Sequence, residues 1–207
     1  MTSILTNLSA AQVGILTTSQ IHSLTGSDWA GLSTAQAAAL TSGQIQAITP
    51  STIVSISSAA IQALTTSAVP GLTGTEMAAL TSTQVGALST ATLTSTQLGA
   101  LSATSVAGLT TADIAALSTT QLSGLSGKEV AALNTAQINS LTTNQLPGLT
   151  TADVAALSTY QVTNLSTSLL SNFSNPQLAA FAYSQVAALT SAQTGALTST
   201  QIQALAV

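Results

Sequence analysis

The sequence contains very few side chains that could take part in acid–base, nucleophilic or metal chemistry. It has one His, five Asp or Glu, a single cation, Lys128, and no Cys. A nucleophilic Ser or Thr needs a base beside it, and His22 is the only imidazole. No serine lies in a G-x-S-x-G elbow. We therefore expect no enzymatic activity and no catalytic residue, and we expect His22 to be an exposed surface residue.

The acidic residues are spread along the chain and do not form a ligand cluster in the sequence. They are Asp28, Glu76, Asp113, Glu129 and Asp153, and no two of them share a short segment. A zinc site is built from Cys, His and carboxylate ligands close together, which one His and no Cys cannot supply. We expect no metal site and no cofactor.

The elements that position these side chains come from an eight-residue repeat. Leu, Ile or Phe recurs every eight residues from Leu8 to Leu80 and again from Leu93 to Leu197. A truncated unit, 88–92, separates the two runs. Each octad reads L-[ST]-x-x-[QDE]-[VIL]-x-[AGS], which gives every residue of the repeat an octad position from one to eight. Self-similarity of this kind is the signature of a repeat fold.

Positions two and five of the octad carry a helix-start signal. Position two is Ser or Thr in almost every unit, and position five is mostly Gln, with all five acids in the remaining slots. In a capping box, the Ser or Thr oxygen accepts from the backbone N–H three residues on, and the Gln or Glu there accepts from the cap's own N–H. A carboxylate is also favoured near a helix N-terminus. We therefore interpret the five acids as structural caps.

The octad predicts an all-α solenoid of very short capped helices. Eight residues allow about one and a half helical turns, which are not stable alone, so neighbouring segments must pack on one another. Positions one and six form the buried stripe, and the small side chains of Ala or Gly at positions seven and eight permit adjacent segments to approach closely. The alternative is a β-solenoid, although Ala, Gln and Leu favour helix over strand. We expect one continuous solenoid over 1–207, with the truncated unit at 88–92.

A weaker, longer period is present in the string G-L-[ST]-x-x-[QDE]-x-A-A-L. It begins at Gly31 and again at Gly71, five octads later, which suggests five octads in each superhelical turn. In that arrangement Glu76, Asp113 and Asp153 would lie on one edge. An alternative role for this edge is a ladder of carboxylates that binds calcium. Calcium prefers six to eight oxygen ligands, which is more than these carboxylates supply.

The few aromatic residues separate into two groups. Trp29, Phe173 and Phe181 occupy apolar positions of the octad, so we expect them in the core. Tyr160 and Tyr183 occupy variable positions, where exposure is expected, and a sugar-binding platform from them is an unsupported alternative. Three N-x-[ST] matches, at Asn7, Asn164 and Asn172, follow from the octad pattern.

Composition excludes several partners. The formal net charge is −4 and only 3% of residues are charged, so nothing neutralises phosphates and nucleic-acid binding is not expected. Ser and Thr interrupt every apolar run well before it reaches the length of a membrane span. The first residues show no basic segment followed by an apolar stretch, so no cleavable signal peptide is visible.

The chain resembles two kinds of repeat. Leu149–Leu157, LTTADVAAL, is locally similar to the first helix of TAL-effector repeats. Their longer period and base-reading loop have no counterpart here, so DNA binding is not implied. More broadly, the whole chain resembles the LTTAQ-type octad repeats, which are low-complexity sequences of secreted and surface proteins of bacteria. That resemblance implies a structural or adhesive role and names no catalytic residue.

We therefore expect a structural protein that self-assembles head to tail into an extracellular fibre, sheath or adhesive stalk. The expected partner is a further copy of the chain, with polysaccharide or another surface as a further candidate. We expect a location outside the cell or at its surface, with export that uses no visible cleavable signal. The alternatives are a binding module whose regular Ser/Thr face contacts ice or a polysaccharide, and a fragment of a larger repeat adhesin.

Overall fold

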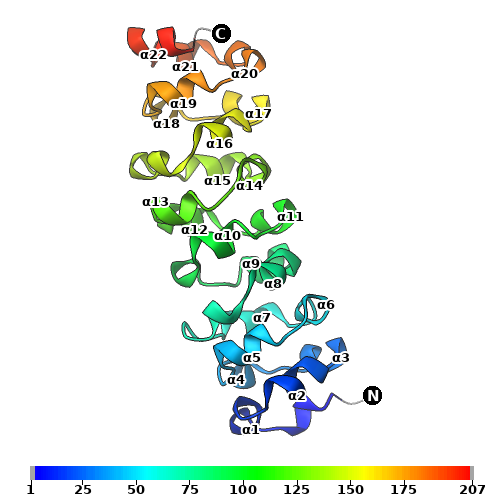
Figure 1. Ribbon diagram of the computed structural model, residues 1–207. Helices are drawn as coiled ribbons and strands as arrows, with labels where there is room; N and C mark the ends of the chain where they lie inside the picture. Colours follow the sequence, from blue (N-terminus) through cyan, green and yellow to red (C-terminus); the bar gives the residue numbers. More distant parts are fainter. Residues whose placement is uncertain (1–2, 206–207) are drawn as a thin grey trace. The chain divides into compact units, whose positions relative to one another are not determined.

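The computed structural model describes residues 3–205, and all regular secondary structure among them is helical (Figure 1). The predicted all-α solenoid of short capped helices is confirmed, and with no strand in the described residues the β-solenoid alternative has no support. The chain divides into two compact units, Met1–Gly108 and Leu109–Val207. The single continuous solenoid expected over 1–207 stays a prediction.

The N-terminal unit contains eleven α-helices of four to six residues and three 3₁₀ segments among the described residues. They are η1 (Leu5–Asn7), α1 (Ala10–Gly14), α2 (Thr18–Ser23), α3 (Gly26–Ala30), α4 (Thr34–Ala37), α5 (Ser42–Gln46), α6 (Pro50–Ile53), α7 (Ser58–Gln62), η2 (Val69–Gly71), α8 (Gly74–Ala79), α9 (Ser82–Val85), η3 (Thr90–Thr92), α10 (Ser95–Leu98) and α11 (Ala103–Val106).

The C-terminal unit has the same construction. Its described elements are α12 (Thr111–Ala116), α13 (Thr119–Leu122), α14 (Gly127–Ala132), α15 (Thr135–Asn139), η4 (Thr143–Gly148), α16 (Thr151–Ala155), α17 (Thr159–Thr163), α18 (Thr167–Leu170), α19 (Asn175–Ala179), α20 (Tyr183–Ala187), α21 (Ser191–Gly195) and α22 (Ser199–Ala204). None of the helices between residues 3 and 205 is long and apolar enough to cross a bilayer.

The predicted capping box begins most of the helices. At α17, the Gln161 N–H donates to Ser158 Oγ at 3.1 Å, and the Ser158 N–H donates to Gln161 Oε1 at 2.7 Å. Each helix then closes with a tighter bond, as where the Leu165 N–H donates to the Val162 carbonyl at 3.1 Å. One octad therefore satisfies its helix-end groups locally, which is why so short a helix can repeat.

Positions one and six form the core, as predicted. Leu149 and Val154 are both buried, and the same two positions supply most of the buried apolar residues in both units. Trp29, Phe173 and Phe181 are buried in these slots, and the two Phe rings meet edge to face with centroids 6.2 Å apart. The expectation that these three aromatics fill the core is confirmed.

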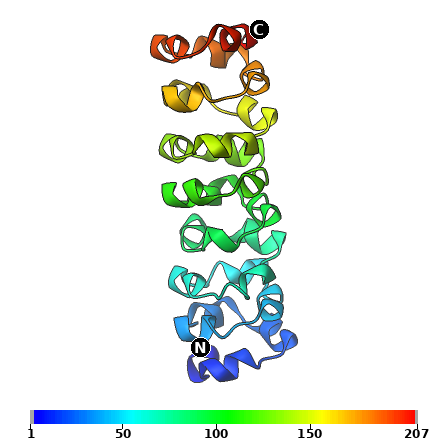
Figure 2. The same cartoon turned by 90° about the vertical axis from the view of Figure 1, so that its left-hand side faces the viewer.

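Three octads make one turn in each unit. In the N-terminal unit α1 packs on α4, α2 on α5 and α3 on α6, and in the C-terminal unit α16 packs on α19, α17 on α20 and α18 on α21 (Figures 1 and 2). The estimate of five octads per turn is therefore wrong. The recurring string reflects where sequence blocks repeat, whereas the turn is set by which helices pack together. Asp113 and Asp153, five octads apart, thus lie on different sides of the turn and form no ladder.

The truncated unit at 88–92 replaces one full side of a turn. It forms η3, and α7 packs on α9, α8 on α10 and α9 on α11 around it. The hydrogen bonds between turns shorten in sequence accordingly, since Gln97 reaches Val69 and Leu72, 28 and 25 residues back. In turns of full octads the same bonds, as from Gln44, reach 31 and 28 residues back. The shortened unit thus keeps the three-sided arrangement with less chain.

Thr150→Ala is expected to lower the free energy of unfolding by about 1 kcal/mol, the usual cost of a lost cap. The Thr150 side chain accepts from the Asp153 N–H at 3.2 Å and donates to the Asp153 carboxylate at 2.7 Å. Urea unfolding measures the change. Thr151→Ala is the control, because Thr151 is the exposed first residue of α16 and is not its cap. Equal destabilisation by the two variants would contradict the capping role.

Candidate functional site

The position-five glutamines connect successive turns of each unit. Gln44 Nε2 donates to the Val13 carbonyl at 2.9 Å and to the Leu16 carbonyl at 2.8 Å, while Gln44 Oε1 accepts from the Thr41 N–H at 2.9 Å. The amide therefore begins its own helix and also bonds the turn before it. We call the pair of bonds from Nε2 the inter-turn amide contact.

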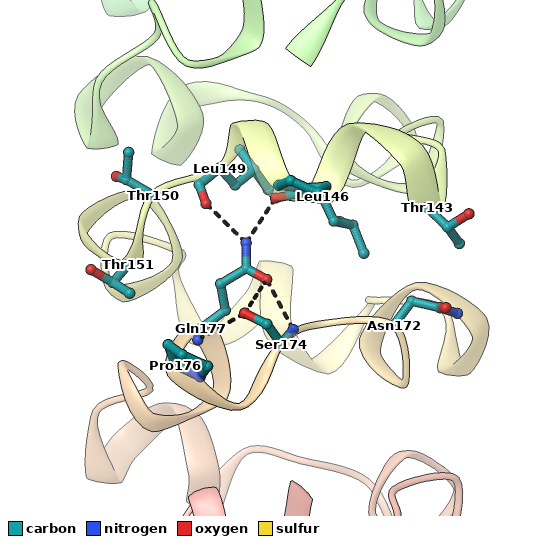
Figure 3. Close-up of a pocket in the computed structure, with 10 residues that line it drawn as sticks. Thr143, Leu146, Leu149, Thr150, Thr151, Asn172, Ser174, Pro176 and Gln177 are labelled. Atoms are coloured by element: carbon teal, nitrogen blue, oxygen red, sulfur yellow. Dashed lines mark hydrogen bonds between the residues drawn. The ribbon is translucent and has the colours of Figure 1, made fainter. Parts of the chain in front are cut away.

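The contact recurs in both units with nearly constant geometry. Figure 3 shows it at Gln177, whose Nε2 lies 2.8 Å from Leu146 O and 2.9 Å from Leu149 O. The same paired bonds to the preceding turn are made by Gln36, Gln44, Gln84, Gln97, Gln145, Gln161, Gln185 and Gln193. Gln201 makes a variant of the contact, to the Ser171 and Phe173 carbonyls. Most of these side chains are buried.

Sequence reasoning missed this second role because it treated Gln and the acids as equivalent caps. A carboxylate oxygen can accept from the cap as an amide oxygen does, but an ionised carboxylate has nothing to donate to a carbonyl. Only Gln fills both roles. The excess of Gln over Glu at position five was the signal that could have revealed it.

The acids act as caps, as predicted. Asp153 is buried, and its Oδ2 accepts from the Thr150 N–H at 2.8 Å and from Thr150 Oγ1. Asp28 also has a partner on another segment, because its Oδ1 accepts from the Ile4 N–H at 2.8 Å. A carboxylate suits this position because the segment before α1 presents a backbone N–H, which needs an acceptor. Other turns present carbonyls at this place, which need a donor such as the amide of Gln44.

The hydrogen bonds around Asp28 predict a pH dependence for the N-terminal segment. The side chain of Thr25, followed by the backbone N–H groups of Ile4 and Thr25, lowers the pKa of Asp28 from its ordinary value of 3.8, against a smaller opposing effect of burial. A lowered pKa stabilises the folded state above the unfolded value, and this stability is lost as pH falls through the folded pKa. We expect the Ile4 amide resonance to titrate with a midpoint below 3.8.

Nuclear magnetic resonance of the Ile4 amide between about pH 6 and pH 2 measures this effect. Asp28→Asn should abolish the titration of that resonance. A midpoint at or above the ordinary value would show that the Ile4 contact does not favour the ionised carboxylate.

One stretch of the N-terminal unit has no inter-turn amide contacts. Four consecutive octads carry Thr52, Ala60, Ala68 and Glu76 at position five, none of which offers an amide N–H from its side chain. The stretch still packs on the turn before it, through α6 on α3, α7 on α4 and η2 on α5. We call residues 52–76 the amide-free stretch, because no amide side chain at position five there bonds the preceding turn. Packing alone holds the stretch to residues 21–48.

The remaining candidate residues do not come together. His22 is exposed, as predicted, and its Nδ1 lies 3.3 Å from the Ala47 carbonyl. No group of three or more His, Asp or Glu side chains suited to a metal ion occurs within residues 3–205. Asn7, Asn164 and Asn172 are exposed. The amides of Asn164 and Asn172 each donate to a backbone carbonyl four residues back, both at 2.8 Å.

A groove of about 370 Å³ lies beside Gln177 in the C-terminal unit (Figure 3). Its wall is formed by Pro147 and Pro176 together with the polar side chains of Thr143, Thr151 and Asn172. No lining residue is ionisable, so the groove holds no pair for acid–base chemistry. It can offer hydroxyl and amide hydrogen bonds to an uncharged molecule.

Comparison with known proteins agrees with the octad. A family model for the ALTTAQ repeat matches residues 106–143, 130–167 and 170–207. No curated protein matches the sequence. The matched segments cover nearly all of the C-terminal unit, in which Gln145, Gln177 and Gln193 make inter-turn amide contacts. Residues 106–207 are therefore built from ALTTAQ repeats, as the LTTAQ-type octad predicted.

Proposed function

We propose that this chain is a non-enzymatic structural protein that self-assembles by head-to-tail stacking of its repeats. The product would be an extracellular or cell-surface fibre, sheath or adhesive stalk. The observation that carries the proposal is the inter-turn amide contact, which joins one turn to the next through main-chain carbonyls. Main-chain carbonyls are present in every turn, so the same contact is chemically available between two copies.

The first described turns present amide donors that no hydrogen bond between described residues uses. Gln12 and Gln20 occupy position five, accept from their own caps, and are exposed, in contrast to the buried glutamines that follow. Their Nε2 groups make no hydrogen bond within residues 3–205. They are therefore free to donate to the carbonyls of a second copy.

The last described turns present the matching acceptors. If the first octad of a second copy follows Leu205, the carbonyls 31 and 28 residues before its Gln12 and Gln20 are those of Val186 and Leu189, and of Thr194 and Leu197. Within the described residues no glutamine amide donates to them. A copy stacked in the register of the repeat would place exposed amides against these carbonyls. Such a heterologous contact does not close on itself and generates a filament, and a surface with so few charges offers little repulsion against it.

The experiment compares filament formation by the wild-type chain with a Gln12→Glu, Gln20→Glu variant. Glutamate keeps the capping role, as Glu129 does with Ser126, but removes both donors. Negative-stain microscopy and sedimentation velocity should show filaments for the wild type and mostly monomers for the variant. The control is Gln46→Glu, Gln62→Glu, which makes the same charge change at exposed residues of α5 and α7. Filaments in the Gln12, Gln20 variant would disprove stacking through these amides, and a monomeric wild type would overturn the proposal.

A further inference from the structure

Two exposed tyrosines that are distant in the sequence lie on neighbouring helices. Tyr160 is the second residue of α17 and Tyr183 is the first residue of α20, and these two helices pack together on consecutive turns of the C-terminal unit. The side chains are 70% and 77% exposed. Tyr183 lies one position short of a full turn of three octads after Tyr160. The turn of three octads thus brings together two rings that look scattered in the sequence.

Neither ring has a structural role that accounts for its presence. The Ser158–Gln161 capping box of α17 is complete without Tyr160. The other aromatic rings of the C-terminal unit, Phe173 and Phe181, are buried against each other and away from solvent. Large exposed aromatic side chains that do not support the core are typical of binding surfaces, because the ring offers apolar area with little loss of side-chain entropy.

The helices that carry the two rings are held together by hydrogen bonds. Gln185 Nε2, in α20, donates to the Leu157 carbonyl just before α17 at 2.6 Å. Thr163 Oγ1, in α17, donates to the Ala188 carbonyl just after α20 at 3.2 Å. The backbone under the two tyrosines is therefore fixed across the pair of turns, and a ligand that contacts both rings need not order it.

The surroundings of the rings select the chemistry of the ligand. Thr159 and Ser184, which adjoin the tyrosines in sequence, are exposed hydroxyl side chains, and neither α17 nor α20 contains an ionisable acid or base other than the phenols. A ligand here gains nothing from carrying charge. It should present a flat C–H face to each ring and hydroxyl groups to the neighbours, which is the chemistry of a neutral sugar.

The separation of the rings favours a polymer over a single sugar. Helices packed on one another have axes about 8–10 Å apart, so rings on α17 and α20 are separated by about the width of a helix. In an extended β-1,4-linked glycan every second sugar presents the same face at a repeat of this order. We infer that Tyr160 and Tyr183 form a stacking platform for a neutral, extended β-linked polysaccharide, a binding activity distinct from head-to-tail assembly.

The test is affinity electrophoresis of the full chain in gels containing hydroxyethyl cellulose, with calorimetric titration of cellohexaose and chitohexaose. We expect the wild type to be retarded and to bind one of the two oligosaccharides. Tyr160→Ala and Tyr183→Ala should each weaken binding at least about tenfold, equivalent to about 1.4 kcal/mol. Tyr160→Phe and Tyr183→Phe should keep most of it, because the stacking face remains.

The control is Ile15→Ala, which removes an 81% exposed apolar side chain from the N-terminal unit and should leave glycan binding unchanged. Circular dichroism of every variant checks that the helices remain. Absence of binding to all three probes by the wild type would overturn the inference, as would unchanged binding by the Tyr160→Ala, Tyr183→Ala double variant. If that variant instead loses filaments and keeps glycan binding, the rings form a lateral contact between copies and the inference is wrong.

Discussion

Gly71→Ala is expected to destabilise the N-terminal unit by about 3 kcal/mol or more, at the upper end of overpacking effects. Gly71 ends η2, which packs on α5, and a Cβ at this position would overlap the carbonyl group of Ser42. The obstacle is backbone and not the tip of a flexible side chain, so α5 and η2 would have to separate. Chemical denaturation followed by circular dichroism measures the loss.

Gly43→Ala is the matched control, one residue from the carbonyl that Gly71 approaches. Nothing lies within 4 Å of a Cβ added at Gly43, which is exposed in α5. Alanine is the better helix former, so this variant should be stabilised by about 0.4–1 kcal/mol. A loss of stability in Gly71→Ala together with a gain in Gly43→Ala would show that the close approach of the two turns at Gly71 causes the loss. A neutral Gly71→Ala would show that the turns separate at little cost.

Gln161→Asp is expected to destabilise the C-terminal unit by about 2–3 kcal/mol, the cost of leaving a buried acceptor, the Leu133 carbonyl, without its amide donor. The variant keeps a carboxylate that can cap α17 through Ser158, as Asp153 caps α16. It removes the bonds from Nε2 to the Val130 and Leu133 carbonyls, at 3.1 and 2.7 Å. Stability therefore falls through the contact between turns and not through the cap.

Asp153→Gln is the reciprocal change. Gln161 bonds the carbonyls 31 and 28 residues before it. The same steps back from residue 153 reach the carbonyls of Leu122 and Leu125, to which no glutamine amide donates within the described residues. A glutamine should cap α16 and also donate to them, so the variant should unfold at a higher denaturant concentration than the wild type. If both substitutions leave the unfolding midpoint unchanged, the inter-turn amide contact contributes nothing to stability.

Local chemistry made much of the fold predictable from the sequence. The Ser158–Gln161 pair and the burial of Leu149 and Val154 follow from relations within one octad, and these were predicted correctly. The number of octads per turn depends on how helices from different octads pack. No single octad contains that information, and the five-octad estimate failed for this reason. Once three octads per turn are known, the long-range bonds of Gln44 to Val13 and Leu16 follow directly.

The candidate sites were predicted only as separate residues. The exposure of His22, Tyr160 and Tyr183 followed from their variable octad positions. Their neighbours could not be predicted, because the identity of the residue three octads away matters only once the turn is known. The pairing of α17 with α20 places two rings that are distant in the sequence on adjacent helices, and the groove beside Gln177 depends on prolines from two different turns.

The amide-free stretch, 52–76, has a mechanical consequence. When the N-terminal unit is pulled at its two ends, a turn separates only after every bond between it and its neighbour has been broken. Gln36, Gln44 and Gln84 each add paired hydrogen bonds that must break under load, whereas 52–76 is held to 21–48 by packing alone. We expect this junction to yield at the lowest force and to lengthen the unit stepwise, so that an assembly under tension would absorb strain there while the turns on either side stay folded.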